Sequence, residues 1–177
     1  MKVRIPMKTS DLLLQDLDIE MSNTRRTLER VPEGKNDFKC HEKSMPLGKL
    51  AMHCATLPLF GHYIMEDSSM DLANSKHPQN PLVFNSREEC LKQFDENAAR
   101  CRASVAAATD ATLTQPWRFT FGEHLISETP RSLAFRQMCF NHLVHHTAQL
   151  GVYLRLNDIP VPALYGPSAD EQWSPAK

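Results

Sequence analysis

The segment that most constrains the fold is residues 129–157, TPRSLAFRQMCFNHLVHHTAQLGVYLRLN, which carry the longest helical pattern in the chain. Thr129 is a favourable N-cap residue, and Pro130 suits the first helical position because its missing N–H would have no helical partner there. At about 100° per residue, His142 and His146 fall on the same apolar sector. The sequence therefore predicts one long helix that buries two imidazole rings.

The spacing of His142 and His146 predicts a pair of metal ligands. Residues four apart lie on successive turns of one helix face, close enough to bind a single ion. The run His-Leu-Val-His-His lacks the glutamate that serves as general base in HExxH zinc proteases. A single histidine on an apolar face is more often a hydrogen-bonded core residue than a ligand. Two histidines on successive turns of the same face favour a metal site. His145 points to the edge of the face.

A third ligand has to come from another segment, because catalytic metal sites commonly have three protein ligands and one open position. The best candidate is His53, which lies on the apolar face of a helical pattern over residues 46–65. His62 falls on the opposite face of the same pattern. Cys139, three residues before His142, is a further candidate for a soft metal, although a free cysteine is more often a small core residue.

Two other segments have the apolar spacing of amphipathic helices. The first begins at Ser10 and ends near Pro32, and the second covers residues 86–110, with Ser86 and Glu89 forming a capping box. Together with the two histidine-bearing helices they predict an all-α fold, most economically a four-helix bundle.

The connections between these helices carry weaker signals. Ser44 is the expected N-cap of the helix that carries His53. The polar link that follows this helix is long for a compact domain. Residues 111–128 contain β-branched and aromatic residues around a glycine, which predicts a short hairpin or an irregular cover with Trp117 at the edge of a pocket.

Length and charge predict a single small domain with no affinity for nucleic acid. The 177 residues suit one domain over 1–177, with an ordered wrap through Tyr165 and a frayed tail over about 166–177. Twenty basic and twenty-one acidic residues leave a net charge of −1. Polyphosphate binders need a basic surface, so we expect no nucleic-acid partner.

Cysteine usage and hydropathy predict a cytoplasmic protein. The N-terminus lacks the apolar stretch of a signal peptide, and no segment approaches about 18 consecutive apolar residues, so no membrane span is expected. The chain has five cysteines and no CxxC pair, which favours reduced thiols. These are Cys40, Cys54, Cys90, Cys101 and Cys139.

The early segment GKLAMH and the late segment NHLVHHTAQLGVYLRLNDIPVP together resemble the DinB/YfiT-like metalloenzyme family, and the tail YGPSADE is also similar. The resemblance covers nearly the whole chain. It implies a four-helix bundle in up-down-down-up order, with a long crossover between the second and third helices. It also implies a divalent metal bound by His53, His142 and His146. Where the family often reads HHRGQ, this chain reads His-His-Thr-Ala-Gln.

The leading functional hypothesis is a metal-dependent enzyme that binds zinc or nickel, since imidazole suits both ions. The resemblance implies a thiol-dependent S-transferase or isomerase that acts on a small molecule, with a low-molecular-weight thiol as cosubstrate. Gln149 and Tyr153 share the sector of the histidines and are candidates for orienting substrate. Arg155 would pair with a carboxylate only if the C-terminal wrap turned it inward.

Two alternatives stay open. A non-catalytic bundle would use the ion only to tie two helices together or to sense metal. A metal-free bundle for dimerisation or binding would leave three histidines buried without an ion.

We also expect a homodimer, because Phe140, Val144 and Val152 lie on the back of the last helix. Packing beneath the C-terminal wrap would explain these three residues equally well.

Overall fold

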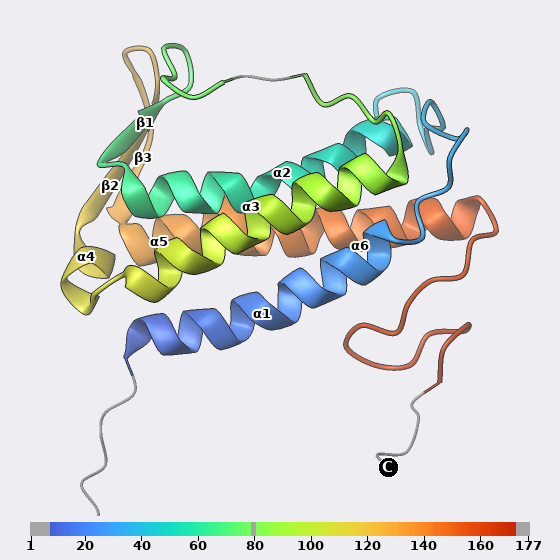
Figure 1. Ribbon diagram of the computed structural model, residues 1–177. Coiled ribbons are helices and arrows are strands. Elements are labelled where there is room, and N and C mark those ends of the chain that lie inside the picture. The colour runs from blue at the N-terminus through green and yellow to red at the C-terminus, as the bar shows by residue number, and fades with distance from the viewer. Residues whose placement is uncertain (1–7, 79–80, 173–177) are drawn as a thin grey trace, which may run out of the picture.

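The computed structural model describes residues 8–78 and 81–172, so part of the predicted frayed tail, residues 173–177, lies outside the described residues. The molecule is mainly helical (Figure 1). Its long helices are α1 (Thr9–Leu28), α2 (Leu47–Glu66), α3 (Arg87–Ala107) and α6 (Asn141–Leu156). Three short helical segments, α4 (Asp110–Thr114), α5 (Arg131–Phe135) and the π-helical η1 (Arg136–Phe140), complete the helical part.

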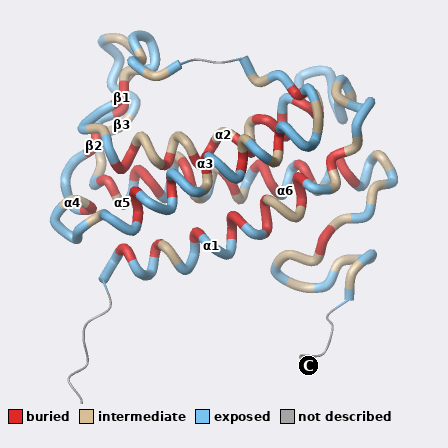
Figure 2. Tube along the Cα trace, in the orientation of Figure 1, coloured by how far each residue is buried: buried red, intermediate tan, exposed pale blue. Residues whose placement is uncertain are grey.

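The long helices bury one face each against their neighbours. α1 and α2 each pack on both α3 and α6, and Figure 2 shows the buried positions recurring along these helices. Leu17, Leu50, Phe94 and Leu150 are almost completely buried, one from each long helix. Apolar residues spaced three and four apart place such side chains on one face, so the helices form and associate for the same reason.

A small sheet stands at one end of the helices (Figure 1), and the prediction of an all-α fold is wrong on this point. β2 (Pro116–Phe121) and β3 (His124–Pro130) form an antiparallel hairpin around Gly122, whose φ of +57° favours glycine. β1 (Ser69–Asp71) pairs parallel to β2 and was missed, because it is too short to show a pattern.

Aromatic packing holds the sheet against α2. Trp117 and Phe119 of β2 are buried, and the ring of Phe60 on α2 lies edge-on to both, with centroids 6.3 and 5.7 Å away. Trp117 therefore belongs to the core under the sheet and does not line the pocket described below, contrary to the prediction. Burial of these large rings explains why the hairpin forms where the helical signal stops.

Strand pairing overrides the predicted start of the last helix. Thr129 is not an N-cap: it lies in β3 opposite Trp117, and the helix begins at Arg131 with Pro130 as its N-cap. The hydrogen bonds of the hairpin satisfy the backbone here, so the strand continues through a residue that would suit a cap.

Of the other predicted caps, only Ser86 is confirmed: its hydroxyl accepts the backbone N–H of Glu89 at 3.1 Å. Ser10 lies inside α1, where it is buried, and Lys8 is the N-cap. Pro46 rather than Ser44 precedes α2. Neither wrongly predicted serine caps the backbone with its side chain, and at the start of α1 the Asp11 carboxylate accepts the backbone N–H of Lys8 at 3.3 Å.

Arg131 joins the end of α2 to the start of α5. Its side chain is buried, and its Nη1 donates to the carbonyl oxygens of Ile64, of Met65 at 3.1 Å and of Asp67 at 2.6 Å. Ile64 and Met65 belong to the last turn of α2 and Asp67 follows it, so no helical N–H is available to these carbonyls. The contact fixes α2 relative to the helical segment that leads into α6.

The C-terminal segment is ordered well beyond Tyr165. Glu171 forms ion pairs with Arg26 of α1 and with Arg30 just after α1, and Asp170 pairs with Arg155 of α6. The wrap therefore extends through Gln172, past the predicted limit at Tyr165. Arg155 is held by Asp170 on the exposed side and does not turn inward. Within the described ranges, no helix has the combination of length and apolarity that a membrane span requires.

Candidate metal centre

The structure brings His53 of α2 together with His142 and His146 of α6. The possible ligand nitrogens of the three rings all lie within 4.8 Å of one another. The Nε2 atoms of His53 and His142 are 3.4 Å apart. Two nitrogens bound to a tetrahedral ion at 2.0–2.1 Å would stand about 3.4 Å apart, so this edge already has the spacing that an ion requires.

Two of the three rings are oriented by hydrogen bonds at Nδ1. His146 Nδ1 lies 2.7 Å from Gln149 Oε1, and His142 Nδ1 lies 3.3 Å from the Met138 carbonyl oxygen. Both partners are acceptors, so each ring carries its proton on Nδ1 and keeps the Nε2 lone pair free. Such outer partners are typical of metal-binding histidines, because they fix both tautomer and ring direction.

Burial keeps the three imidazoles neutral. It lowers the pKa of His53 to about 4, with the nearby rings of His146 and His142 lowering it further. The pKa values of His142 and His146 are also lowered, mainly by burial. A neutral imidazole offers a lone pair, so no proton has to be displaced before a metal binds near pH 7.

The donor set is three nitrogens without a carboxylate or thiolate. Across the described residues, this histidine group is the one cluster of three such side chains with the spacing for an ion. Three imidazoles suit Zn²⁺ or Ni²⁺ and leave at least one coordination position for another molecule. The residues present therefore fit a divalent ion.

A pocket of about 410 Å³ adjoins the cluster at His146. It lies between α6 and the link that precedes α2. Its lining residues are Cys40, Lys43, Ser44, Met45, Leu50, His146, Gln149, Val152 and Tyr153. Both candidates for orienting substrate, Gln149 and Tyr153, are therefore at the pocket.

Each of these two residues also has a structural partner. Gln149 accepts from His146, a role that the sequence reasoning missed although the i,i+3 spacing allows it. The Tyr153 hydroxyl donates to the Met45 carbonyl oxygen at 2.8 Å, and its ring meets Phe38 edge-on at 5.9 Å. Tyr153 thus attaches the pocket-forming link to α6.

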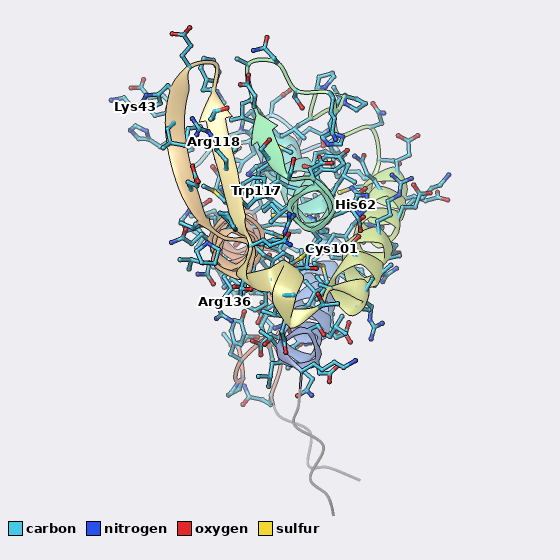
Figure 3. The ribbon with its side chains drawn as sticks, turned by 90° about the vertical axis from the view of Figure 1, so that its left-hand side faces the viewer. Lys43, His62, Cys101, Trp117, Arg118 and Arg136 are labelled. Atoms are coloured by element: carbon cyan, nitrogen blue, oxygen red, sulfur yellow. The ribbon has the colours of Figure 1, made fainter. Side chains whose placement is uncertain are left out.

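The other candidate residues lie outside the cluster. His145 is exposed, and His62 Nδ1 is 2.7 Å from the Ser104 hydroxyl oxygen on α3. Cys139 is buried against α2, where the Cβ of a residue replacing Gly61 would stand only 2.5 Å from its Sγ. In Figure 3, Cys101, which packs at the same place, lies among the helices.

The π-helical segment η1 ends at Phe140, directly before α6, whose first turn carries His142. It contains Met138, whose carbonyl oxygen is the partner of His142. A π-helix inserts an extra residue in a turn, and such insertions are frequent at functional sites. The sequence pattern predicted one regular helix and did not reveal this segment.

Solved structures with this fold include two DinB-like proteins. A DinB-like protein from Bacillus cereus is 18% identical, with a TM-score of 0.63 over 91% of this chain and 100% of that chain. A DinB-like protein from Bacillus subtilis is 15% identical, with a TM-score of 0.65 over 91% of this chain and 98% of that chain. No protein of curated function matches the chain significantly. The sequence model of the DinB superfamily matches residues 16–150, which is most of the chain. The chain therefore belongs to the DinB superfamily.

Proposed function

We propose that this protein is a metal-dependent enzyme in which His53, His142 and His146 hold a divalent ion beside the substrate pocket. The observation that carries the proposal is the convergence of three neutral imidazoles next to an open pocket of about 410 Å³. A purely structural site would be closed by a fourth protein ligand. Zinc and nickel are the two ions that we propose, because imidazole suits both.

The reaction that we propose is a thiol-dependent S-transfer or isomerisation on a small molecule. A bound divalent ion supplies a positive charge that lowers the pKa of a coordinated thiol enough to ionise it near neutral pH. The protein supplies orientation. Gln149 keeps the proton of His146 on Nδ1, and Tyr153 holds the link that forms the opposite wall of the pocket.

Metal content tests the ligand assignment. We expect the purified protein to contain about one equivalent of zinc or nickel per chain by elemental analysis, and alanine at His53, His142 or His146 to abolish stoichiometric binding. His145→Ala is the matched control, since it removes an exposed imidazole from the same helix and should leave metal content unchanged. Loss of metal in the His145 variant but not in the His142 variant would overturn the assignment.

Cobalt substitution tests the proposed chemistry. Low-molecular-weight thiols added to the Co²⁺ form should produce a sulfur-to-cobalt charge-transfer band, and the zinc or nickel form should accelerate conjugation of the thiol to an electrophile. A metal-loaded protein whose cobalt spectrum no thiol perturbs would favour the second candidate function, a metal-stabilised or metal-sensing bundle. That alternative has its own support, since the cluster joins α2 to α6.

The bundle order is also part of the proposal. We propose that α1, α2, α3 and the α5–α6 segment form an up-down-down-up four-helix bundle, with the chain between α2 and α3 as crossover. The pairwise packing of the long helices supports this order. It places the histidine-bearing helices next to each other.

A homodimer through the back of α6 is the remaining element of the proposal. Val152 is 58% exposed but lines the pocket beside His146, so it does not lie on the opposite side of α6. Phe140 is partly buried beneath the guanidinium of Arg136, 5.4 Å from its ring centroid. Light scattering at micromolar concentration should give twice the mass of one chain. A monomer mass would remove the dimer without affecting the metal site.

A further inference from the structure

The pocket beside His146 carries one charged side chain, Lys43. Among the described residues that line it there is no carboxylate, and Lys43 has none within ion-pair distance in the described part of the chain. Lys43 is exposed, and Figure 3 shows it at the outer edge of the molecule, whereas Trp117 lies among the helices and the sheet. Because Lys43 is both exposed and a lining residue, the mouth of the pocket carries a positive charge.

Most other polar groups of the pocket already have partners inside the protein. The Cys40 thiol donates to the Ser44 hydroxyl at 3.4 Å, and the Tyr153 hydroxyl donates to Met45. Gln149 Oε1 accepts from His146. Lys43 Nζ is therefore the donor best able to distinguish one small molecule from another by charge.

The surface between the two polar ends is mainly apolar. Leu50 is 1% exposed and closes the floor, while Met45, Val152 and the ring of Tyr153 contribute to the walls. The volume of about 410 Å³ is large enough for a molecule of the size that small-molecule sites usually bind.

We propose that this pocket binds amphipathic carboxylates: an apolar body lies against Leu50, Val152 and Tyr153, and the carboxylate pairs with Lys43. The opposite end of such a molecule faces His146. The inference rests on the proposed function for the identity of the reacting end, but recognition at Lys43 needs no metal ion. Charge selects the substrate class, because an uncompensated cation at the mouth disfavours a cationic ligand.

Three matched probes of equal chain length test this charge selection by calorimetry or NMR titration: 4-phenylbutanoate, 4-phenylbutan-1-ol and 4-phenylbutylamine. We expect the full-length protein to bind the carboxylate about 2- to 5-fold more tightly than the alcohol, the range of an exposed ion pair. Lys43→Gln should abolish that preference, and Lys43→Glu should reverse it towards the amine. Lys39→Gln is the control, because Lys39 lies in the same link but does not line the pocket.

Each titration is repeated after removal of metal with a chelator, and metal content is measured on the same samples. The carboxylate preference should persist without metal and shrink in high salt. A preference that survives Lys43→Gln, or failure of all three probes to bind, would overturn the inference. If the protein binds no metal but the preference still depends on Lys43, the proposed function fails and the inference stands. If the protein binds metal but the preference does not depend on Lys43, the inference fails and the proposed function stands.

Discussion

Gly61→Ala should destabilise the protein, because Gly61 of α2 faces tightly packed side chains of α3, α5 and the π-helical segment. A Cβ at this position would stand 2.5 Å from Cys139 Sγ, 2.8 Å from Cys101 Sγ and 3.0 Å from Phe135 Cε2. All three neighbours are fully buried, and both cysteine side chains are short, so none can swing into solvent to make room.

The expected change in the free energy of unfolding is the balance of two contributions. Overpacking of a dense core costs about 1–3 kcal/mol, and replacing glycine by alanine inside a helix returns about 1 kcal/mol. Because the nearest contacts are far below van der Waals separation, we expect the first term to dominate, with a net loss of about 1–2 kcal/mol. For a chain of this size that corresponds to a fall in Tm of about 2–8 °C.

Gly151→Ala provides the matched control on α6. A Cβ there would meet only Val161 Cγ1, at 3.7 Å, which is ordinary van der Waals contact. Only the gain in helix propensity then applies, so the stability of this variant should be unchanged or increased by about 0.5–1 kcal/mol. Urea unfolding followed by circular dichroism, with the m-value checked for each protein, measures both changes. A Gly61→Ala variant as stable as Gly151→Ala would refute the reasoning from packing.

Three further predictions concern the site and its support. Gln149→Leu should weaken zinc affinity about 10- to 100-fold in a chelator competition, with little change in stability, because the partner that orients His146 is lost. Arg131→Met should reduce the free energy of unfolding by about 2–3 kcal/mol in urea, since buried carbonyls of α2 lose their donor. Metal-free protein should lose stability as pH falls from about 6.5 to 4, because the unfolded chain then binds a proton that folded His53, with its pKa of about 4, does not. Unfolding measured at several pH values in chelator should show this slope, and His53→Asn should reduce it, with the lowered pKa values of His142 and His146 accounting for the remainder.

The sequence by itself determined the elements that depend on local pattern. Apolar spacing located the long helices, Ser86 as N-cap marked the start of α3, and an i,i+4 spacing placed two imidazoles on one face of α6. The choice of His53 over His62 also followed from helical phase, and the structure places only His53 with the pair. These features are local because each depends on residues within one or two turns.

Only the tertiary structure decided how distant segments meet. Thr129 suits a helix cap but lies in a strand because Trp117, across the hairpin, is buried against α2. The π-helical turn before His142 has no local signature, and Arg131 finds its partners on a helix more than sixty residues earlier in the chain. Local periodicity states which face of a segment is apolar. It does not state which other segment covers that face, and that pairing, set by packing between distant parts of the chain, built both the histidine cluster and the pocket beside it.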